Sequence, residues 1–397
     1  MPPNVIMTTW PLLFGMGVLM LGAGLQGTLI GLRATLEGFP TIVTGAVMSC
    51  YYVGYVLGTL VAPPLLRQLG HIRVFATLAA IASVAILVQG CFVNPFAWGA
   101  MRLLSGLCFS GIYVVAESWL NDRASRANRG RLFAVYMLVL YGGLGAAQFL
   151  LILADPRTLV PFMLVSALIS LAMVPIVVSE QQVPEHAKPS KVRLRELYRN
   201  SPLGVVGVTV SGMVSAIIFS MGPAYAKLSG LETKSVATFM GLSILAAVIT
   251  QYPVGRLSDR TDRRTVIAGA CTLAMIVAGC IVAFPKMPHP LFLTLAALFS
   301  GFALTLYSLS VSHVNDKLEP AQMVAASSAL LLLNGTAAAF GPLLVGGLIS
   351  AFGPPAYFAA LALLTGALAV YDLWRKSRRR PVPPSQKGPF VRAKPTA

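Results

Sequence analysis

Twelve long apolar runs constrain the fold of this chain more than any other feature of its sequence. A helix needs roughly 20 apolar residues to cross the hydrocarbon core of a bilayer, and each run is about that long. Because the runs are continuous rather than alternating, they exclude a membrane β-barrel. The sequence therefore predicts an all-α membrane protein with twelve transmembrane helices, at 10–32, 42–66, 74–93, 97–120, 132–153, 159–179, 203–228, 235–254, 265–284, 291–314, 323–350 and 356–374.

The low charge content supports a lipid environment. Only 11% of the residues are charged, against about 25% in a soluble domain. The net charge of +17 does not indicate nucleic acid, because the basic residues lie between apolar runs and form no aromatic-laced basic face. None of the 5 cysteines has CxxC spacing, so no metal site is expected. We expect the lipid bilayer as a partner, no nucleic acid and no cofactor.

Basic residues collect in the loops of one side. If both termini are cytoplasmic, 24 Lys and Arg residues fall in cytoplasmic segments and 5 in outer segments. This asymmetry predicts a multi-pass protein of the bacterial inner membrane with both termini in the cytoplasm. The first apolar run is about as long as a full span, and no basic residue precedes Arg33. A cleaved signal peptide is therefore not expected.

The two halves of the chain repeat each other. The ends of the fourth and tenth spans match at a constant offset of 194, which pairs Tyr113 with Tyr307 and Asp122 with Asp316. The same offset pairs residues of spans one and seven, and an offset of 193 pairs residues of spans five and eleven. These pairs are Gln26 with Ser220, Arg33 with Lys227, Tyr141 with Asn334, and Gln148 with Gly341. They indicate two parallel six-helix repeats, an arrangement typical of transporters with a central site.

The repeat divides the chain into four predicted segments. Residues 1–179 form an N-terminal six-helix bundle, 180–202 a cytoplasmic linker and 203–374 a C-terminal six-helix bundle. The basic, proline-rich residues 375–397 form a cytoplasmic tail that we expect to be disordered.

Two loops and the fourth span carry recognisable motifs. Residues 255–264 read GRLSDRTDRR, which resembles the major facilitator superfamily loop signature G-x-L-x-D-R-x-G-R-R, with Asp262 in place of the second glycine. The first-half loop at 67–73 has Arg67 where the family has Asp, and Arg102 to Gly106 is similar to the family motif R-x-x-x-G. Glu117-Ser118 and the segments 129–131 and 251–255 look most like the YcaD-type subgroup, which has no established substrate. The resemblance covers nearly the whole chain and implies the major facilitator fold.

Charged residues near the cytoplasmic loops are candidates for a gate. Such side chains can bond helix ends in one closed state and release them in the other. The alternative is that they only follow the preference of basic residues for the cytoplasmic side. The gate candidates are Arg73, Glu117, Arg131, Asp259, Arg260, Arg263 and Arg264.

Arg102 and Glu117 are the charges that lie well inside a span, and such residues mark functional sites by default. They are about 60° apart around the helix and roughly 22 Å apart along it, so they cannot pair directly. Arg102 is a substrate or coupling contact, or it bonds a neighbouring helix through Gln26. Glu117 is a proton or substrate site, a latch to Arg73 or Arg131, or a structural residue.

Other polar residues of the spans complete the candidate substrate and coupling set. Each could equally be a helix-packing residue, and a basic residue at a span end could simply reach the interface. They are Gln26, Arg33, Tyr113, Tyr141, Gln148, Ser220, Lys227, Tyr307 and Asn334.

These features favour a secondary active transporter of a small solute that works by alternating access as a monomer. Cavity cations without matching acids favour an anionic or zwitterionic metabolite, and proton coupling is an open alternative. An exporter of amphipathic compounds or drugs is the second hypothesis, and a non-transporting membrane sensor is the third. The sequence has no phosphate-binding loop and no reactive constellation in the membrane, so neither ATP drive nor an enzyme is expected.

Overall fold

The computed structural model describes residues 5–124, 129–178, 194–318 and 320–376 of the chain. The first half contains α1 (Val5–Leu36), α2 (Thr41–Leu69), α3 (His71–Cys91), α4 (Pro95–Arg123), α5 (Arg129–Leu150) and α6 (Val160–Val177). The second half contains α7 (Leu194–Asn200), α8 (Pro202–Ala216), the π-helical turn η1 (Ile217–Met221), α9 (Gly222–Leu228), α10 (Thr233–Arg260), α11 (Arg263–Ala283), α12 (His289–Asn315), α13 (Pro320–Phe352) and α14 (Ala356–Lys376).

The predicted fold class is confirmed. Within the described residues, 12 helical segments are long and apolar enough to cross a membrane, and they match the twelve predicted runs to within a few residues. The seventh segment, Pro202–Leu228, consists of α8, η1 and α9. The fifth helix ends at Leu150, whereas the apolar run extends to residue 153, because the chain turns after α5.

The short helix α7 was not predicted from the sequence. It lies within the predicted linker 180–202, and its Leu197 is fully buried against the second half. Residues 180–193 of that linker and residues 377–397 of the tail lie outside the described residues. The four segment boundaries therefore stay predictions.

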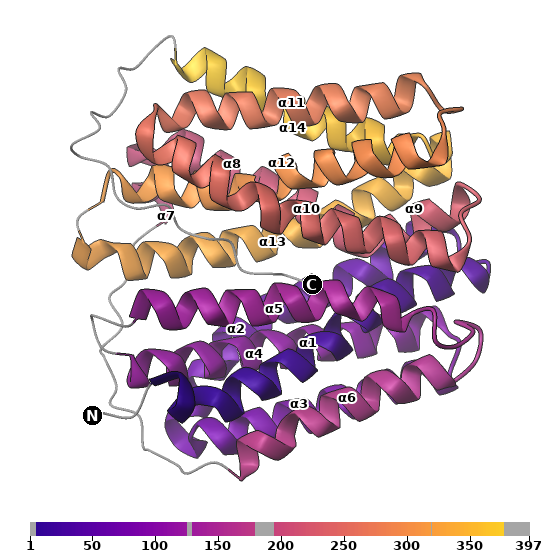
Figure 1. Ribbon diagram of the computed structural model, residues 1–397, viewed down its shortest axis with the longest axis vertical. Coiled ribbons are helices and arrows are strands. Elements are labelled where there is room, and N and C mark those ends of the chain that lie inside the picture. The colour runs from indigo at the N-terminus through magenta and orange to yellow at the C-terminus, as the bar shows by residue number, and fades with distance from the viewer. Residues whose placement is uncertain (1–4, 125–128, 179–193, 319, 377–397) are drawn as a thin grey trace.

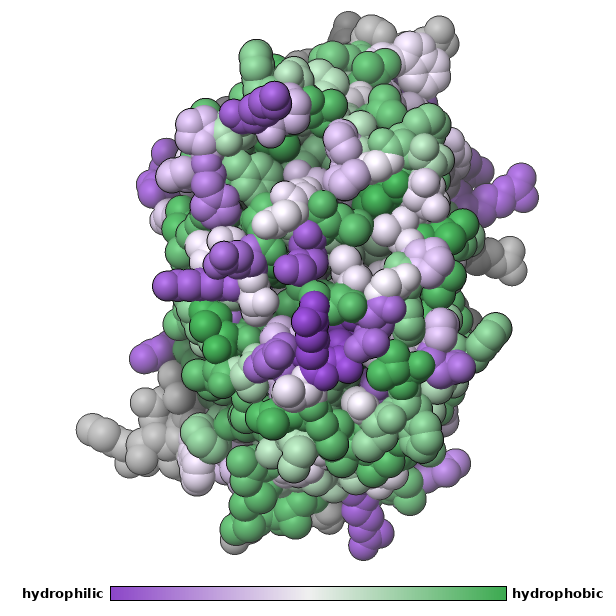
Figure 2. All heavy atoms as spheres, turned by 90° about the vertical axis from the view of Figure 1, so that its right-hand side faces the viewer, coloured by the Kyte–Doolittle hydropathy of each residue, from purple (hydrophilic) through white to green (hydrophobic). Residues whose placement is uncertain are grey.

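The helices form two bundles that lie side by side. Figure 1 shows α1 to α6 at the bottom and α8 to α14 at the top, with the long helices running in roughly the same direction. One end of the bundles carries Arg67, Arg73, Arg131, Arg256 and Arg260, all exposed, and we call it the basic face. The other end, the opposite face, carries the loops 37–40, 92–94, 151–159, 229–232, 284–288 and 353–355. Figure 2 shows the opposite face, where hydrophilic side chains gather across the middle and hydrophobic ones surround them.

Glycines let α2 and α4 pack with their backbones in contact. A Cβ atom on Gly54 would clash with the carbonyl oxygen of Leu103, and one on Gly106 would clash with that of Tyr51. Small residues allow this close approach between membrane helices. The packing brings Tyr51 of α2 beside the part of α4 that carries Arg102.

The two bundles meet mainly toward the opposite face. Thr41 of α2 donates a hydrogen bond to the carbonyl of Gly346 in α13 at 2.9 Å, and the amide of Leu343 donates to the Ser49 hydroxyl at 3.2 Å. Nearer the basic face, a cavity of about 150 Å³ lies between α5 and α10 and is lined by Tyr141, Gln251 and Tyr252 among others. The conformation is therefore closed toward the opposite face.

Candidate functional site

Arg102 lies on α4, about 10 Å along the helix from its start. Asn94 caps this start, because its side chain accepts hydrogen bonds from the amides of Phe96 and Ala97. The Arg102 side chain is 4% exposed, and its guanidinium carbon lies 4.3 Å from the centre of the Tyr51 ring. Its buried Nε has no hydrogen-bond partner among the described residues. A buried donor without an acceptor is unfavourable, so this guanidinium is suited to receive an oxyanion.

Residues of both bundles surround a small pocket beside Arg102. The pocket has a volume of about 20 Å³, which is close to the space of one water molecule. The N-terminal half contributes Thr28, Tyr52, Arg102 and Gln148, and the C-terminal half contributes Phe219, Ser220, Met240 and Ile244. A site shared by two bundles changes shape when the bundles move relative to each other.

The polar groups of this pocket are neutral and hydrogen-bonded to one another. The Thr28 hydroxyl donates to Oε1 of Gln148 at 2.6 Å, and the Ser220 hydroxyl donates to the Tyr52 hydroxyl at 3.1 Å. The second bond joins the two bundles. Arg102 is thus the single charged side chain among the residues that line the pocket.

The π-helical turn η1 places Ser220 at the pocket. It interrupts the seventh span just before Gly222 and Pro223, and π-helical turns occur frequently at functional sites. A Cβ atom on Gly31 would lie 2.9 Å from the Ser220 carbonyl oxygen. The glycine therefore allows α1 to approach this turn closely.

Two predicted candidates are used for packing between helices. Nε2 of Gln26 donates to the Ser105 hydroxyl at 3.2 Å, and the ring of Tyr51 lies beside Arg102, where one of the two alternatives placed Gln26. The Asn334 amide donates to the Val208 carbonyl at 3.0 Å and so ties α13 to α8.

Arg33 and Lys227 lie at helix ends on the opposite face. Arg33 forms a salt bridge of 2.6 Å with Glu37 and donates to the Pro156 carbonyl at 2.9 Å. Lys227 is half-buried in the last turn of α9. Neither residue lines the pocket beside Arg102.

Glu117 lies among tyrosines nearer the basic face. Its carboxylate acts electrostatically on Tyr55, Tyr113 and Tyr136 of the N-terminal half and on Tyr307 of the C-terminal half. The structure thus brings Glu117 together with Tyr113 and Tyr307, which occupy equivalent positions in the two repeats. Tyr113 also donates to the sulfur of Met20 at 3.4 Å. Tyr141 lines the 150 Å³ cavity between α5 and α10 and interacts electrostatically with Tyr307, so it adjoins this cluster.

Arg263 is the centre of a charged cluster inside the C-terminal half. Its Nε donates to Asp316 at 2.6 Å, its Nη2 lies 3.1 Å from Asp259, and its Nη1 donates to the Ser258 hydroxyl at 3.1 Å. Asp262, which replaces the signature glycine, caps α11 by accepting from the amide of Arg264 at 3.2 Å. These contacts join α10, α11 and α12.

Three other gate candidates form no such cluster in the described part of the chain. Arg73, Arg131 and Arg260 are exposed, and no ion pair of theirs occurs in the described part of the chain. Arg264 is buried at 5% exposure. A latch between Glu117 and Arg73 or Arg131 stays a prediction for the state that is closed toward the basic face.

Sequence reasoning missed several residues that the structure places at these sites. Tyr51 and Tyr52 follow each other on α2, and the sequence offered only their type as a signal. Asp316 was part of the repeat match, yet its pairing with Arg263 was not foreseen. His71, which belongs to the loop expected at 67–73, begins α3 and lies buried, with its Nε2 3.1 Å from the Ser118 hydroxyl and 3.6 Å from the Asp122 carboxylate.

Comparison with known proteins identifies the family. The family model described as Major Facilitator Superfamily matches residues 12–308 and 240–396. The chain belongs to this superfamily. It is a membrane transporter and not an enzyme, and its twelve spans and bacterial relatives make it a multi-pass inner-membrane protein.

Similar proteins support the resemblance to the YcaD-type subgroup. An uncharacterised transporter of this superfamily from Enterobacter sp. (strain 638) is 30% identical over 337 residues, which are 83% of this chain and 86% of that protein. The YcaD transporter of Escherichia fergusonii, also uncharacterised, is 29% identical over 333 residues, with coverage of 83% and 86%.

Solved structures confirm the fold alone, because their sequences are distant. The nucleoside transporter NupG has a TM-score of 0.80 at 13% identity and covers 94% of this chain and 100% of its own. A bacterial homologue of the human lysosomal transporter Spinster, solved in an inward-facing and unoccupied conformation, has a TM-score of 0.73 at 14% identity. It covers 95% of this chain and 96% of its own.

Proposed function

We propose that this member of the major facilitator superfamily is a secondary transporter of a small organic anion. The observation that carries the proposal is Arg102, a buried guanidinium beside a pocket shared by both bundles, whose Nε has no hydrogen-bond partner in the described part of the chain. A guanidinium presents its donors in a planar fork that matches a carboxylate or phosphate. The anion completes the hydrogen bonding that the protein leaves open at this position.

The charges around the pocket favour an anion over a zwitterion. The ammonium group of a zwitterion needs an acidic partner, and the pocket beside Arg102 offers only neutral polar groups. Glu117, the acid nearer the basic face on the same helix, lies roughly 22 Å further along α4. A solute with a single negative charge therefore matches the charge of this site best, and the pocket must widen as the bundles move to admit the whole solute.

Alternating access supplies the transport step. The contacts of α2 with α13, and of Ser220 with Tyr52, close the opposite face in this conformation. In the other state these contacts separate and the basic face closes around Glu117 and the loop arginines. Each chain contains both bundles, so we expect a monomer to suffice. We place the basic face and both termini in the cytoplasm, because basic residues favour that side.

Export of amphipathic compounds is the second candidate function. The rings of Tyr51, Tyr55 and Tyr113 follow one another with centroids 6.4 Å apart, and they form an aromatic wall between α2 and α4. Such a wall suits a solute with an aromatic body. The two functions differ in whether a neutral aromatic compound binds as well as its anion.

The test compares matched probes on purified protein by thermal shift. Benzoate carries one negative charge, phenylalanine is a zwitterion and benzyl alcohol is neutral, while all three share one ring. We expect benzoate to raise the melting temperature most in the wild type. Arg102→Gln should weaken benzoate binding about 10- to 100-fold, because it removes charge-assisted hydrogen bonds of roughly 1.5–3 kcal/mol.

Two further variants separate binding from stability. Arg102→Lys keeps the charge but loses the fork, so it should bind poorly while reaching the membrane normally. Tyr51→Phe keeps the ring face under the guanidinium and should bind like the wild type. A stable Arg102→Gln protein with unchanged binding and uptake would refute the role of Arg102. Equal binding of benzyl alcohol would instead favour the amphipathic exporter.

A further inference from the structure

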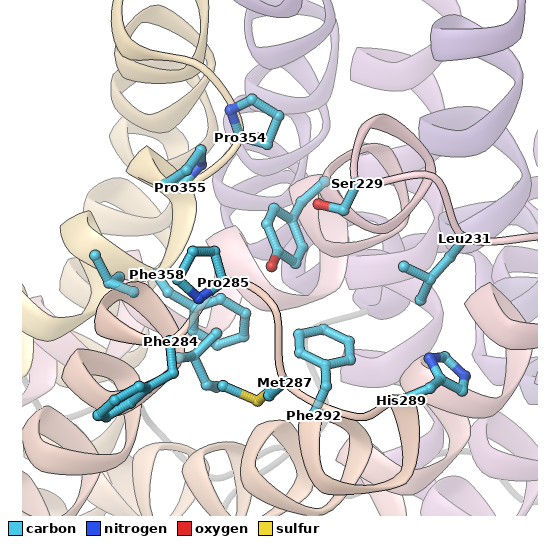
Figure 3. A pocket seen from close by; sticks show the side chains of 13 residues that line it. Ser229, Leu231, Phe284, Pro285, Met287, His289, Phe292, Pro354, Pro355 and Phe358 are labelled. Carbon is cyan, nitrogen blue, oxygen red and sulfur yellow. The ribbon is translucent and has the colours of Figure 1, made fainter.

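A second pocket opens on the opposite face, entirely within the C-terminal bundle. It has a volume of about 260 Å³ and lies where α9, α11, α12 and α14 end or begin (Figure 3). None of its lining residues belongs to the pocket beside Arg102. The pocket is therefore separate from the central site.

Buried aromatic rings form the floor of this pocket. Tyr225, Phe292 and Phe358 are 7%, 9% and 2% exposed. Tyr225 stacks on Tyr357 with centroids 4.4 Å apart, and Phe358 meets Tyr225 edge-on at 5.2 Å. These contacts hold the floor rings in place, so the apolar surface exists before any molecule binds.

Exposed side chains form the rim. Figure 3 shows Phe284, Pro285, Pro355, Ser229 and His289 around the opening. The proline rings are stiff, and the Ser229 side chain is hydrogen-bonded to Tyr225 of the floor. The lining contains no carboxylate, ammonium or guanidinium group, so the pocket has no fixed charge with which to select an ion.

Size and lining together define the class of ligand. An apolar cavity of about 150 Å³ suffices to bind benzene, and this pocket is larger at about 260 Å³. Aromatic rings prefer edge-to-face or offset contact with other rings, and small-molecule sites are apolar pockets with few polar groups. We propose that this pocket binds a neutral, fused two-ring aromatic molecule of the size of indole.

The experiment measures the binding of 5-fluoroindole to the purified full-length protein by ¹⁹F NMR line broadening. Ser229→Trp places a large side chain at the rim and should weaken binding at least tenfold by filling the pocket. Lys234→Trp is the matched control, since Lys234 is exposed at the start of α10 on the same face and does not line the pocket. Its binding should stay within twofold of the wild type.

Two comparisons decide the result. The Arg102→Gln variant should bind 5-fluoroindole like the wild type, because the two pockets share no residue. Loss of binding in this variant would show that the probe occupies the central site, and it would overturn the proposal. Equal broadening by the wild type and Ser229→Trp would show that the probe only enters the detergent micelle, and this too would overturn it. Failure of this site would leave the role of Arg102 in the central pocket untouched.

Discussion

At the scale of single residues, the buried arginines Arg263 and Arg102 differ in how far the protein satisfies the hydrogen-bond donors of their guanidinium groups. Arg263 is surrounded by acceptors, namely Asp316, Asp259 and the Ser258 hydroxyl. Arg102 has the face of Tyr51 and a buried Nε that has no hydrogen-bond partner among the residues the structure describes. A guanidinium that the protein satisfies completely stabilises the fold, whereas one left incomplete is available to a ligand.

The Arg263 cluster gives a stability prediction. Asp316→Asn should lower stability by about 3–5 kcal/mol, because it leaves a buried guanidinium without its closest counter-charge. Asp259 is 42% exposed, and Asp259→Asn should change stability by no more than about 1 kcal/mol. Thermal unfolding of both variants in the same detergent checks the difference. Equal decreases in melting temperature for the two variants would contradict the prediction that the buried Asp316 contributes more to stability than the exposed Asp259.

At the scale of elements, glycines decide how closely α2 of one bundle approaches α13 of the other. A Cβ atom on Gly346 would clash with the carbonyl oxygen of Thr41, and one on Gly45 would clash with that of Pro342. Gly347, the neighbour of Gly346, has only the end of the Ile42 side chain nearby, at 3.9 Å. The close contact therefore depends on particular glycines and not on the small residues of α13 in general.

A methyl group at Gly346 should open the contact. We expect Gly346→Ala to shift the protein away from the conformation closed toward the opposite face, while Gly347→Ala leaves the distribution unchanged. Spin labels at the exposed positions 157 and 234, one on each half, can report the separation in a cysteine-free background. The role of this contact would be refuted if both variants gave the wild-type distance distribution.

At the scale of the whole molecule, the two faces differ in charge and in closure. The bundles meet toward the opposite face, and the 150 Å³ cavity between α5 and α10 lies nearer the basic face. If the basic face is cytoplasmic, the closed side of this conformation is the outer one, which is expected of an inward-facing state. The sidedness of the basic face therefore decides which state the structure represents.

Reporter fusions can measure this sidedness. A fluorescent protein fused after Trp374 should fold and fluoresce, and alkaline phosphatase at the same position should stay inactive, because both termini are expected in the cytoplasm. Fusions in the loop 284–288 should give the reverse pattern. An active phosphatase after Trp374 would place the basic face outside and turn the assigned state into an outward-facing one.

The sequence alone determined the spans, the family and the two intramembrane charges. Whether a segment enters the membrane depends on its own composition, so the sequence predicts the twelve spans directly. Arg102 and Glu117 can be identified in the same way, because their neighbours in the span are apolar. The loop motif likewise consists of adjacent residues. Each of these properties belongs to a short stretch of chain.

Only the tertiary structure decided the partners of these residues. Arg102 meets Tyr51 instead of Gln26, Ser220 bonds Tyr52 across the bundles, and Arg263 binds Asp316. Such contacts depend on how each helix is rotated and which helices are its neighbours, and these are set by glycines and side chains distributed over several spans. The aromatic pocket likewise arises from helix ends that lie far apart in the sequence, at Tyr225, Phe292 and Phe358. No local sequence pattern predicts the contacts between these residues, because the helix ends come together only when the bundle has packed.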